Sequence, residues 1–373
     1  MAHFESHRNW GIPPWRINFT PSRHPLPTGA DIAVVGAGFS GLAAAAWIRS
    51  LAPRMSVVVL EASHIGAGAS GRTGGIALAE TAAGDFPGLG DVLAGFSAIL
   101  KKLGVDCDLS LSGAWEIGRR DALEDSEIQW NDSGPLQVFK EVPGGSVDPG
   151  KLVSGLGRAA QRLGATIIED APVLRVEWGR QQTLKLRGCA LRANRILFAT
   201  NAFSLDLIGL GEGMHPRLTL AVATAPLTEQ QLKAIGLATR KPFYTVDLPY
   251  LWGRVCRNNS LVLGAGLVQA QEAGNLERVD IAAEEPSAMF SSLEERIRGL
   301  HPALNAVQFT HRWGGPILFR DGWHPILTRH PENPNSLVLG AYAGHGVALS
   351  VYFGVWAAET LLGRRDLPAW AAL

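Results

Sequence analysis

The chain has 373 residues, of which 46% are apolar and 18% charged, so it can bury the cores of two lobes and is too apolar to be disordered. Lys plus Arg and Asp plus Glu number 34 each, so the formal net charge is zero. A chain without net positive charge is not expected to attract nucleic acid or an anionic membrane. The three scattered cysteines lack CxxC spacing, which argues against a disulfide framework or a structural zinc site and favours a reducing cytoplasm.

The N-terminal ten residues, MAHFESHRNW, contain no apolar core of signal-peptide length, and we interpret residues 1–24 as an N-terminal arm that is polar at its start. Two long uncharged runs, 32–48 and 336–358, have the length of candidate membrane spans. Glycine clusters interrupt both runs. Each is therefore interpreted as a buried strand, a glycine turn and a buried helix, without a membrane span.

The apolar run 31–35 leads directly into GAGFSG, and the helix-forming stretch LAAAAWIRSL, a second apolar strand and Glu61 follow. This is the order of elements that a dinucleotide-binding βαβ unit requires. Gly36 permits the tight turn, Gly38 lets the backbone approach a pyrophosphate, and Gly41 lets the helix pack on the strand. The predicted cofactor-binding residues of this unit are Gly36, Gly38, Phe39, Ser40, Gly41, Glu61 and Ala62.

A carboxylate at Glu61 suits the adenosine ribose and would repel a 2′-phosphate, so NAD and FAD remain as candidate cofactors. The stretch ASHIGAGASGRTGG comes next, where an ordinary NAD domain needs no such segment. An extended FAD molecule needs close backbone approach there, and Ser70, Arg72 and Thr73 can donate hydrogen bonds along its pyrophosphate and ribityl chain. A flexible surface loop is the alternative. The predicted FAD-binding residues of this stretch are Ala69, Ser70, Arg72, Thr73, Gly74 and Gly75.

The motif GASGRTGG resembles the glycine oxidase/D-amino-acid oxidase superfamily of FAD enzymes, and within it the γ-glutamylputrescine oxidase group. The similarity continues through ATNAF (199–203), YLWGRVCRNNSLVLGAG (250–266), HRWGGPI (311–317) and GAYAGHGVALS (340–350), and it spans residues 10–363. The resemblance implies an α/β fold, in which a Rossmann-like FAD-binding domain is interleaved with an antiparallel-sheet substrate domain.

The stretch 148–163 is expected to form a helix that Asp148 caps and Gly164 ends, followed by the strand ATIIE. Residues 183–198 alternate as a two-stranded β pattern. In the family that the chain resembles, the residue matching Val173 contacts the adenine through its backbone. The side chain of Val173 can equally be that of an ordinary valine on an edge strand. Thr200 and Asn201 are expected to form a turn near the cofactor.

The resemblance implies that the FAD-binding domain is discontinuous, with segments 25–85, 150–212 and 324–373. The substrate domain is then inserted as 86–149 and 213–323. Alternating runs at 217–227 and 243–255 and an acidic helix at 282–300 belong to the second insertion. We expect these strands to form an antiparallel sheet that covers the flavin.

The C-terminal GHGV motif comprises Gly344, His345, Gly346 and Val347. A strand is expected to lead into this turn, and a helix to run from Val347 to about Gly363. The helix N-terminus would point at the N1 and C2-carbonyl side of the flavin, where its dipole stabilises the negative charge of reduction by about 1–2 kcal/mol. His345 is either a further donor there or a buried packing residue.

The resemblance implies an enzyme that oxidises the C–N bond of a small amine or amino acid by hydride transfer to flavin N5, giving an imine that hydrolyses. Arg312 either pairs with a substrate carboxylate, which implies an amino acid or N-alkyl glycine, or forms an ion pair between lobes, which favours an uncharged or cationic amine. The candidate substrate-site residues are Tyr250, Trp252, Arg254, Arg312, Trp313 and His345.

No cysteine occurs in 317–327, and Arg72 stands where some relatives attach the flavin to a histidine, so we expect noncovalent FAD. No lysine follows Lys241, which leaves open whether oxygen or another acceptor reoxidises the flavin. The alternatives are a dehydrogenase of the same fold that reduces a quinone or protein, a non-catalytic flavin-binding protein and an NAD-dependent dehydrogenase. The oligomeric state stays open.

Overall fold

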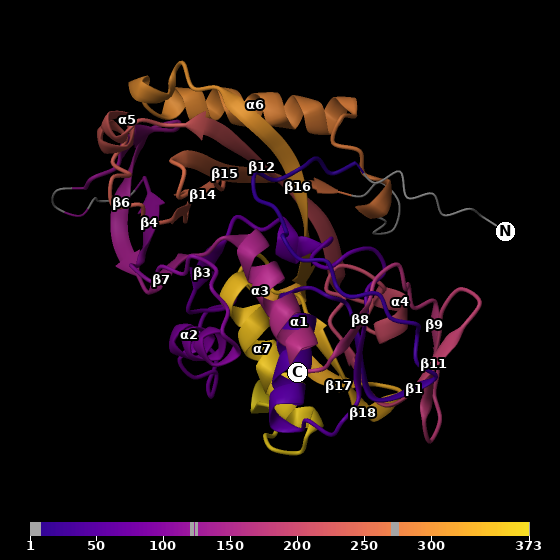
Figure 1. The fold of residues 1–373 in the computed structure, drawn as a ribbon. Helices are drawn as coiled ribbons and strands as arrows, with labels where there is room; N and C mark the ends of the chain where they lie inside the picture. The colour runs from indigo at the N-terminus through magenta and orange to yellow at the C-terminus, as the bar shows by residue number, and fades with distance from the viewer. Residues whose placement is uncertain (1–8, 120–122, 124–125, 270–275, 373) are drawn as a thin grey trace.

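The computed structural model describes residues 9–119, 123, 126–269 and 276–372. Two eight-stranded sheets organise these residues, and a short two-stranded sheet pairs β3 (Ile76–Leu78) with β7 (Gly144–Ser146). Four helices gather beside the first sheet, namely α1 (Phe39–Leu51), α2 (Val92–Leu103), α3 (Pro149–Arg162) and α7 (Gly346–Leu361), whereas α6 (Glu284–Leu300) lies across the outer side of the second (Figure 1).

The first sheet has a parallel core. Its order is β17 (Ile326–His330), β18 (Asn333–Gly340), β11 (Ala190–Phe198), β1 (Gly29–Val35), β2 (Val57–Leu60) and β8 (Thr166–Ile168). Strands β18, β11, β1, β2 and β8 run parallel, while β17 and the pair β9 (Arg175–Glu177) and β10 (Gln182–Lys185) add antiparallel neighbours. All four residues of β2 are buried, as expected for a strand covered on both faces.

Helices α1 (Phe39–Leu51), α3 (Pro149–Arg162) and α7 (Gly346–Leu361) confirm three helices predicted from sequence. Asp148 caps α3 as predicted, because its Oδ1 accepts a hydrogen bond from the Lys151 N–H at 2.8 Å. A side chain at Gly41 would place its Cβ 1.9 Å from the Gly36 oxygen, so the predicted close approach of α1 to the preceding turn is also confirmed. Helices α1 and α7 are buried on nearly all sides, which accounts for their uniformly apolar sequences.

The second sheet has the order β16 (Phe309–Arg320), β12 (Met214–Pro226), β15 (Ser260–Gln269), β14 (Trp252–Val255), β13 (Phe243–Thr245), β4 (Ala114–Gly118), β6 (Pro135–Val142) and β5 (Gln129–Asn131). The antiparallel prediction is right for all neighbours except β13 and β4, which are parallel. These two strands are far apart in the chain, so no hairpin forces them to run in opposite directions. Short helices α4 (Leu205–Ile208) and α5 (Glu229–Ala234) lie in the connections.

Two segments pack differently from their sequence interpretation. Trp10 ends the run that was interpreted as a polar arm, yet its side chain is 1% exposed and its Nε1 donates to the Leu276 oxygen at 3.1 Å. The polar residues 1–8 lie outside the described residues. Helix α2 (Val92–Leu103) comes from the segment 86–149 but packs against α7 in the core beside the first sheet. In the described part of the chain, no helix is long and apolar enough to cross a membrane.

Candidate cofactor and substrate site

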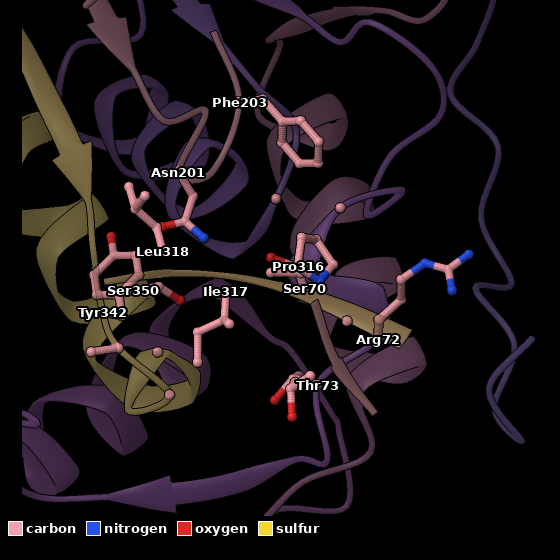
Figure 2. Close-up of a pocket in the computed structure, with 18 of the residues that line it drawn as sticks. Ser70, Arg72, Thr73, Asn201, Phe203, Pro316, Ile317, Leu318, Tyr342 and Ser350 are labelled. Atoms are coloured by element: carbon pink, nitrogen blue, oxygen red, sulfur yellow. The ribbon is translucent and has the colours of Figure 1, made fainter. Parts of the chain in front are cut away.

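A cavity of about 1560 Å³ extends from the carboxyl edge of the first sheet to the inner face of the second. Three residues mark its first end: Gly36 directly after β1, Glu61 directly after β2, and Thr200 at the start of the turn that follows β11. Ligands of open parallel sheets bind at this edge, where the strand order reverses. Residues of β16 and of the β18–α7 turn form another part of the wall (Figure 2).

The glycine turn at the N-terminus of α1 is held by side chains from two other segments. The Phe39 N–H donates to Ser70 Oγ at 2.9 Å. Glu61 Oε2 accepts from the Ala37 N–H at 2.8 Å, and its Oε1 accepts from the Ser63 N–H at 3.0 Å. The carboxylate of Glu61 is therefore fixed at the end of β2, in the cavity wall.

The N-terminus of α7 also faces the cavity, because residues 344–347 line it. Its N-cap, His345, makes no side-chain capping bond, in contrast to Asp148 of α3. His345 Nδ1 and Ser350 Oγ are buried polar atoms without a hydrogen-bond partner among the described residues. Burial lowers the pKa of His345, so its imidazole is neutral at pH 7. Buried polar atoms normally have partners, so this wall suits a polar ligand.

Two hydrogen bonds join the β18–α7 turn to α1 and to the turn after β11. Tyr342 and Ser40 share a hydrogen bond between their hydroxyl oxygens at 2.7 Å, and burial raises the Tyr342 pKa, so the phenol stays protonated. The Ala341 N–H donates to Asn201 Oδ1 at 3.1 Å. Asn201 thus ties the turn after β11 to the turn after β18, and both turns line the cavity.

The second sheet contributes an aromatic wall that includes Tyr250, Trp252 and Trp313. A Cβ at Gly74 would lie 2.1 Å from the Trp252 ring, so glycine is what lets this indole lie against the segment 69–75. Trp313 Nε1 donates to the Arg72 carbonyl oxygen at 2.9 Å. The aromatic wall and the glycine-rich segment therefore form one packed unit.

Arg72 lines the cavity but does not aim its guanidinium along it (Figure 2). Its Nη1 donates to the carbonyl oxygens of Trp10 at 3.1 Å, Gly11 at 2.9 Å and Gly314 at 3.2 Å. Backbone carbonyls thus occupy Nη1, and a contact between Arg72 and a bound cofactor stays a prediction. These hydrogen bonds fasten the N-terminal segment and β16 to the glycine-rich stretch.

Two further predicted site arginines lie outside the cavity lining. Arg254 is buried, and its Nε donates to the Gly74 carbonyl oxygen behind the wall. Arg312 Nε donates to Glu294 Oε1 at 2.7 Å, and this carboxylate raises the pKa of the guanidinium. In this structure Arg254 supports the glycine-rich segment and Arg312 pairs with Glu294 on α6. Neither guanidinium lies in the cavity wall, and a substrate contact of either side chain stays a prediction.

Most of the predicted cofactor residues are brought together in this one cavity, whereas Gly41 and Gly75 support it from behind. The cofactor candidates in its lining are Gly36, Gly38, Phe39, Ser40, Glu61, Ala62, Ala69, Ser70, Arg72, Thr73, Gly74, Val173, Thr200, Asn201, Gly344, His345, Gly346 and Val347. Sequence reasoning missed Tyr342, Ser350, Tyr244 and the β16 residues 316–318, which also line it. Tyr342 and Ser350 stand inside GAYAGHGVALS, so position within that motif was the available signal.

The lining residues fit FAD. A volume near 1560 Å³ exceeds the ~300–1,000 Å³ of ordinary small-molecule sites and leaves room for a long cofactor with a substrate beside it. The α1 N-terminus lies at the end where a pyrophosphate would be held. The turn before α7 lies beside β16, because the Ala343 N–H donates to the Leu318 oxygen at 3.2 Å. The unpartnered polar atoms of His345 and Ser350 offer hydrogen bonds to a polar ring system there.

Residues 31–360 match the family model described as DAO, FAD dependent oxidoreductase. The chain is 26% identical to gamma-glutamylputrescine oxidoreductase of Escherichia coli strain K12 over 381 aligned positions, which cover 89% of this chain and 84% of the relative. The fold is shared with glycine oxidase from Geobacillus kaustophilus (TM-score 0.72, 19% identity, 91% and 96% of the two chains covered). It is also shared with L-proline dehydrogenase from P. horikoshii (TM-score 0.68, 17% identity, 93% and 97% covered). The chain therefore belongs to the DAO family of FAD-dependent oxidoreductases.

Proposed function

We propose that this protein oxidises the C–N bond of a small amine that carries no carboxylate on the reacting carbon. The observation that supports the proposal is one continuous cavity. It extends from the carboxyl edge of the first sheet, where nucleotides bind in open parallel sheets, to the aromatic wall of the second sheet. Bound FAD would supply the chemistry by accepting a hydride from the carbon next to the amine nitrogen, which leaves an imine for hydrolysis.

In this proposal the chain's own residues provide position and electrostatics. Segments 25–85, 150–212 and 324–373 hold the cofactor, and segments 86–149 and 213–323 hold the substrate, with α2 packing on the cofactor side. The α7 N-terminus and the neutral His345 stabilise negative charge at the nearby end of the ring system. Tyr250, Trp252 and Trp313 keep water from the reacting carbon and provide faces that tolerate a cationic amine.

The arrangement of charged groups supports an amine without an α-carboxylate. Arg312, the predicted carboxylate partner, is paired with Glu294 outside the cavity lining. Arg296 lines the cavity but donates to Asp132 and to two backbone carbonyls. Glu285, on α6, adds a carboxylate to the lining. These placements favour an uncharged or cationic substrate over an amino acid.

Noncovalent attachment of FAD is part of the proposal. None of the chain's cysteines is among the cavity-lining residues of the described structure. Acid precipitation of the purified yellow protein is expected to release the flavin into the supernatant. Flavin that stays with the pellet would contradict noncovalent binding.

The decisive experiment is anaerobic reduction of the purified, FAD-loaded protein. Its visible spectrum is recorded before and after addition of primary alkylamines, N-methylglycine and D-amino acids as three separate classes. Alkylamines are expected to bleach the flavin band more strongly than the two carboxylate classes. Admission of air then distinguishes the acceptors: fast recovery with peroxide indicates an oxidase, and slow recovery indicates a dehydrogenase that passes electrons to a quinone or protein.

Two outcomes would overturn parts of this proposal. A yellow protein that no amine bleaches contradicts amine oxidation and supports a non-catalytic flavin-binding role. Stronger bleaching by N-methylglycine or a D-amino acid contradicts the preference for substrates without a carboxylate.

A further inference from the structure

The loop between β13 and β14, residues 246–250, forms part of the substrate side of the cavity; we call it the wall loop. Hydrogen bonds close its base, because the Thr245 N–H donates to the Leu251 oxygen at 2.7 Å and the Leu251 N–H donates to Thr245 Oγ1 at 2.8 Å. Leu248, Pro249 and Tyr250 line the cavity from its tip. The side chains of Leu248 and Tyr250 are 85% and 43% exposed, so packing alone holds this tip weakly.

The backbone of the tip is held instead by two arginines. Arg119 Nη1 donates to the Leu248 oxygen at 3.3 Å. Arg296 donates to the next two carbonyls, from Nη2 to Pro249 at 2.6 Å and from Nη1 to Tyr250 at 3.0 Å. Three successive carbonyl oxygens of one loop thus accept hydrogen bonds from guanidinium groups.

Both guanidinium groups converge on one carboxylate. Asp132 Oδ2 accepts from Arg296 Nη2 at 2.6 Å and from Arg119 Nη2 at 3.1 Å, and Oδ1 accepts from Arg296 Nε at 3.1 Å. The Asp132 side chain is 6% exposed, and the side chains of Arg119 and Arg296 are 21% and 17% exposed. Charge-assisted bonds among groups this buried are strong and directional, and removing one partner leaves the others uncompensated.

The three members come from separate elements. Asp132 directly follows β5, Arg119 directly follows β4, and Arg296 lies on α6. Asp132 accepts hydrogen bonds from the same two arginines that donate to the carbonyl oxygens of the tip, so its effect on the loop passes through them.

We propose that Asp132 is a positioning residue for substrate binding, which fixes the wall loop through Arg119 and Arg296. This inference rests on the proposed function, since it makes the wall loop a determinant of which amine fits beside the flavin. Without the carboxylate, the repulsion between the two guanidinium groups is uncompensated, and Arg296 loses the anchor that orients it toward the loop carbonyls. Arg119 keeps its hydrogen bonds to the backbone carbonyl oxygen of Asp132, so the Arg296 end of the loop is expected to respond more strongly.

The chain offers a matched control on the same helix. Glu294 is 10% exposed, is two residues from Arg296, and also pairs with two arginines, Arg312 at 2.7 Å and Arg298 at 3.9 Å. Neither of those arginines donates to the wall loop in the described structure, and Glu294 does not line the cavity. Asp132→Asn and Glu294→Gln therefore remove equivalent charges, but only the first acts on the loop.

The first readout is amide hydrogen exchange in the FAD-loaded protein, followed in a peptide that covers residues 243–252. We expect exchange in this peptide to accelerate about tenfold or more in Asp132→Asn and to stay at the wild-type rate in Glu294→Gln. Equal acceleration in both variants, or none in either, would overturn the proposal. If Asp132→Asn does not fold, Arg119→Gln replaces it, with the same expectation for the end of the loop near Leu248.

The second readout is anaerobic flavin reduction by n-butylamine, n-hexylamine and benzylamine. In Asp132→Asn we expect the half-saturating amine concentration to rise about tenfold while the limiting reduction rate changes less than about twofold, because the loop positions the substrate and takes no part in the chemistry. The ratio between the three amines should also change. An effect on the limiting rate alone, or the same effect in Glu294→Gln, would contradict a positioning role. If no amine reduces the wild-type protein, the proposed function fails, and the exchange experiment still decides whether Asp132 fixes the loop.

Discussion

At the scale of single residues, the alternation of side chains along β16 sets which of two neighbouring residues lines the cavity. Arg312 and Trp313 are neighbours on β16, and successive side chains of a strand point to opposite faces. Trp313 is fully buried against the glycine-rich segment and lines the cavity, so Arg312 is directed to the other face, where Glu294 accepts its hydrogen bond. A shift of one residue along β16 is therefore enough to exchange a side chain that lines the cavity for one that forms an ion pair with α6.

Arg312→Gln tests this assignment. We expect the half-saturating concentration of the best amine to stay within about twofold of wild type, because the guanidinium does not reach the cavity. The free energy of unfolding should fall by less than about 1 kcal/mol, since the side chain is 41% exposed and solvent screens the pair. Steady-state flavin reduction and urea unfolding measure the two quantities. A tenfold weaker response to amino acids only, with amines unaffected, would restore Arg312 as a carboxylate ligand.

At the scale of elements, the contact between α1 and α7 brings the two cavity-facing helix N-termini into one rigid arrangement. Gly354, in the middle of α7, makes this contact possible, because a Cβ there would lie 2.4 Å from the Ser40 carbonyl oxygen. Ser40 in turn shares a hydrogen bond with Tyr342 at the cavity wall. Helix packing and the shape of the cavity wall are therefore coupled at α1.

Gly354→Ala is expected to destabilise the protein despite the better helix propensity of alanine. Propensity alone favours Ala by about 1 kcal/mol, whereas forcing a methyl group into packed backbone costs about 1–3 kcal/mol. Net destabilisation of up to about 2 kcal/mol should appear in urea unfolding. Gly299→Ala is the control, because an added Cβ on α6 there meets no atom within 4 Å and should be neutral or stabilising. Equal stabilisation in both variants would show that α1 and α7 are farther apart than described.

At the scale of the whole molecule, the first sheet separates two hydrophobic cores, and the cavity opens at its carboxyl edge. One core joins α1, α2, α3 and α7 to one face of the first sheet, and the other joins the opposite face to the second sheet and α6. A long ligand in the cavity contacts strand ends, helix N-termini and the aromatic wall at once. Its binding energy should therefore contribute to the stability of the entire chain.

FAD removal and replacement tests this coupling. At a free FAD concentration of 100 times its dissociation constant, the free energy of unfolding should rise by about 2.7 kcal/mol relative to the apoprotein. The midpoint of thermal unfolding should increase steadily with FAD concentration, which differential scanning fluorimetry records. NAD at the same concentrations serves as the comparison and should give no shift. A shift with NAD and none with FAD would contradict the cofactor assignment.

The sequence by itself determined those features that depend on contiguous residues. The glycine turn, helix α1, strand β2 and Glu61 follow one another within 31–61, and the GHGV turn leads into α7 in the same way. In both cases local backbone geometry requires particular residue types, so the motif predicts both the shape and its place at a cofactor. The cap of α3 by Asp148 is equally local.

Only the tertiary structure decided where long side chains point and which distant segments meet. The directions of Arg72, Arg254 and Arg312 depend on strand parity and on partners far along the chain, which spacing does not encode. Asp132 and Arg296 are 164 residues apart, and no local sequence pattern predicts their pairing. The physical reason is that backbone shape is set by neighbours in sequence, whereas burial and charge pairing are set by neighbours in space.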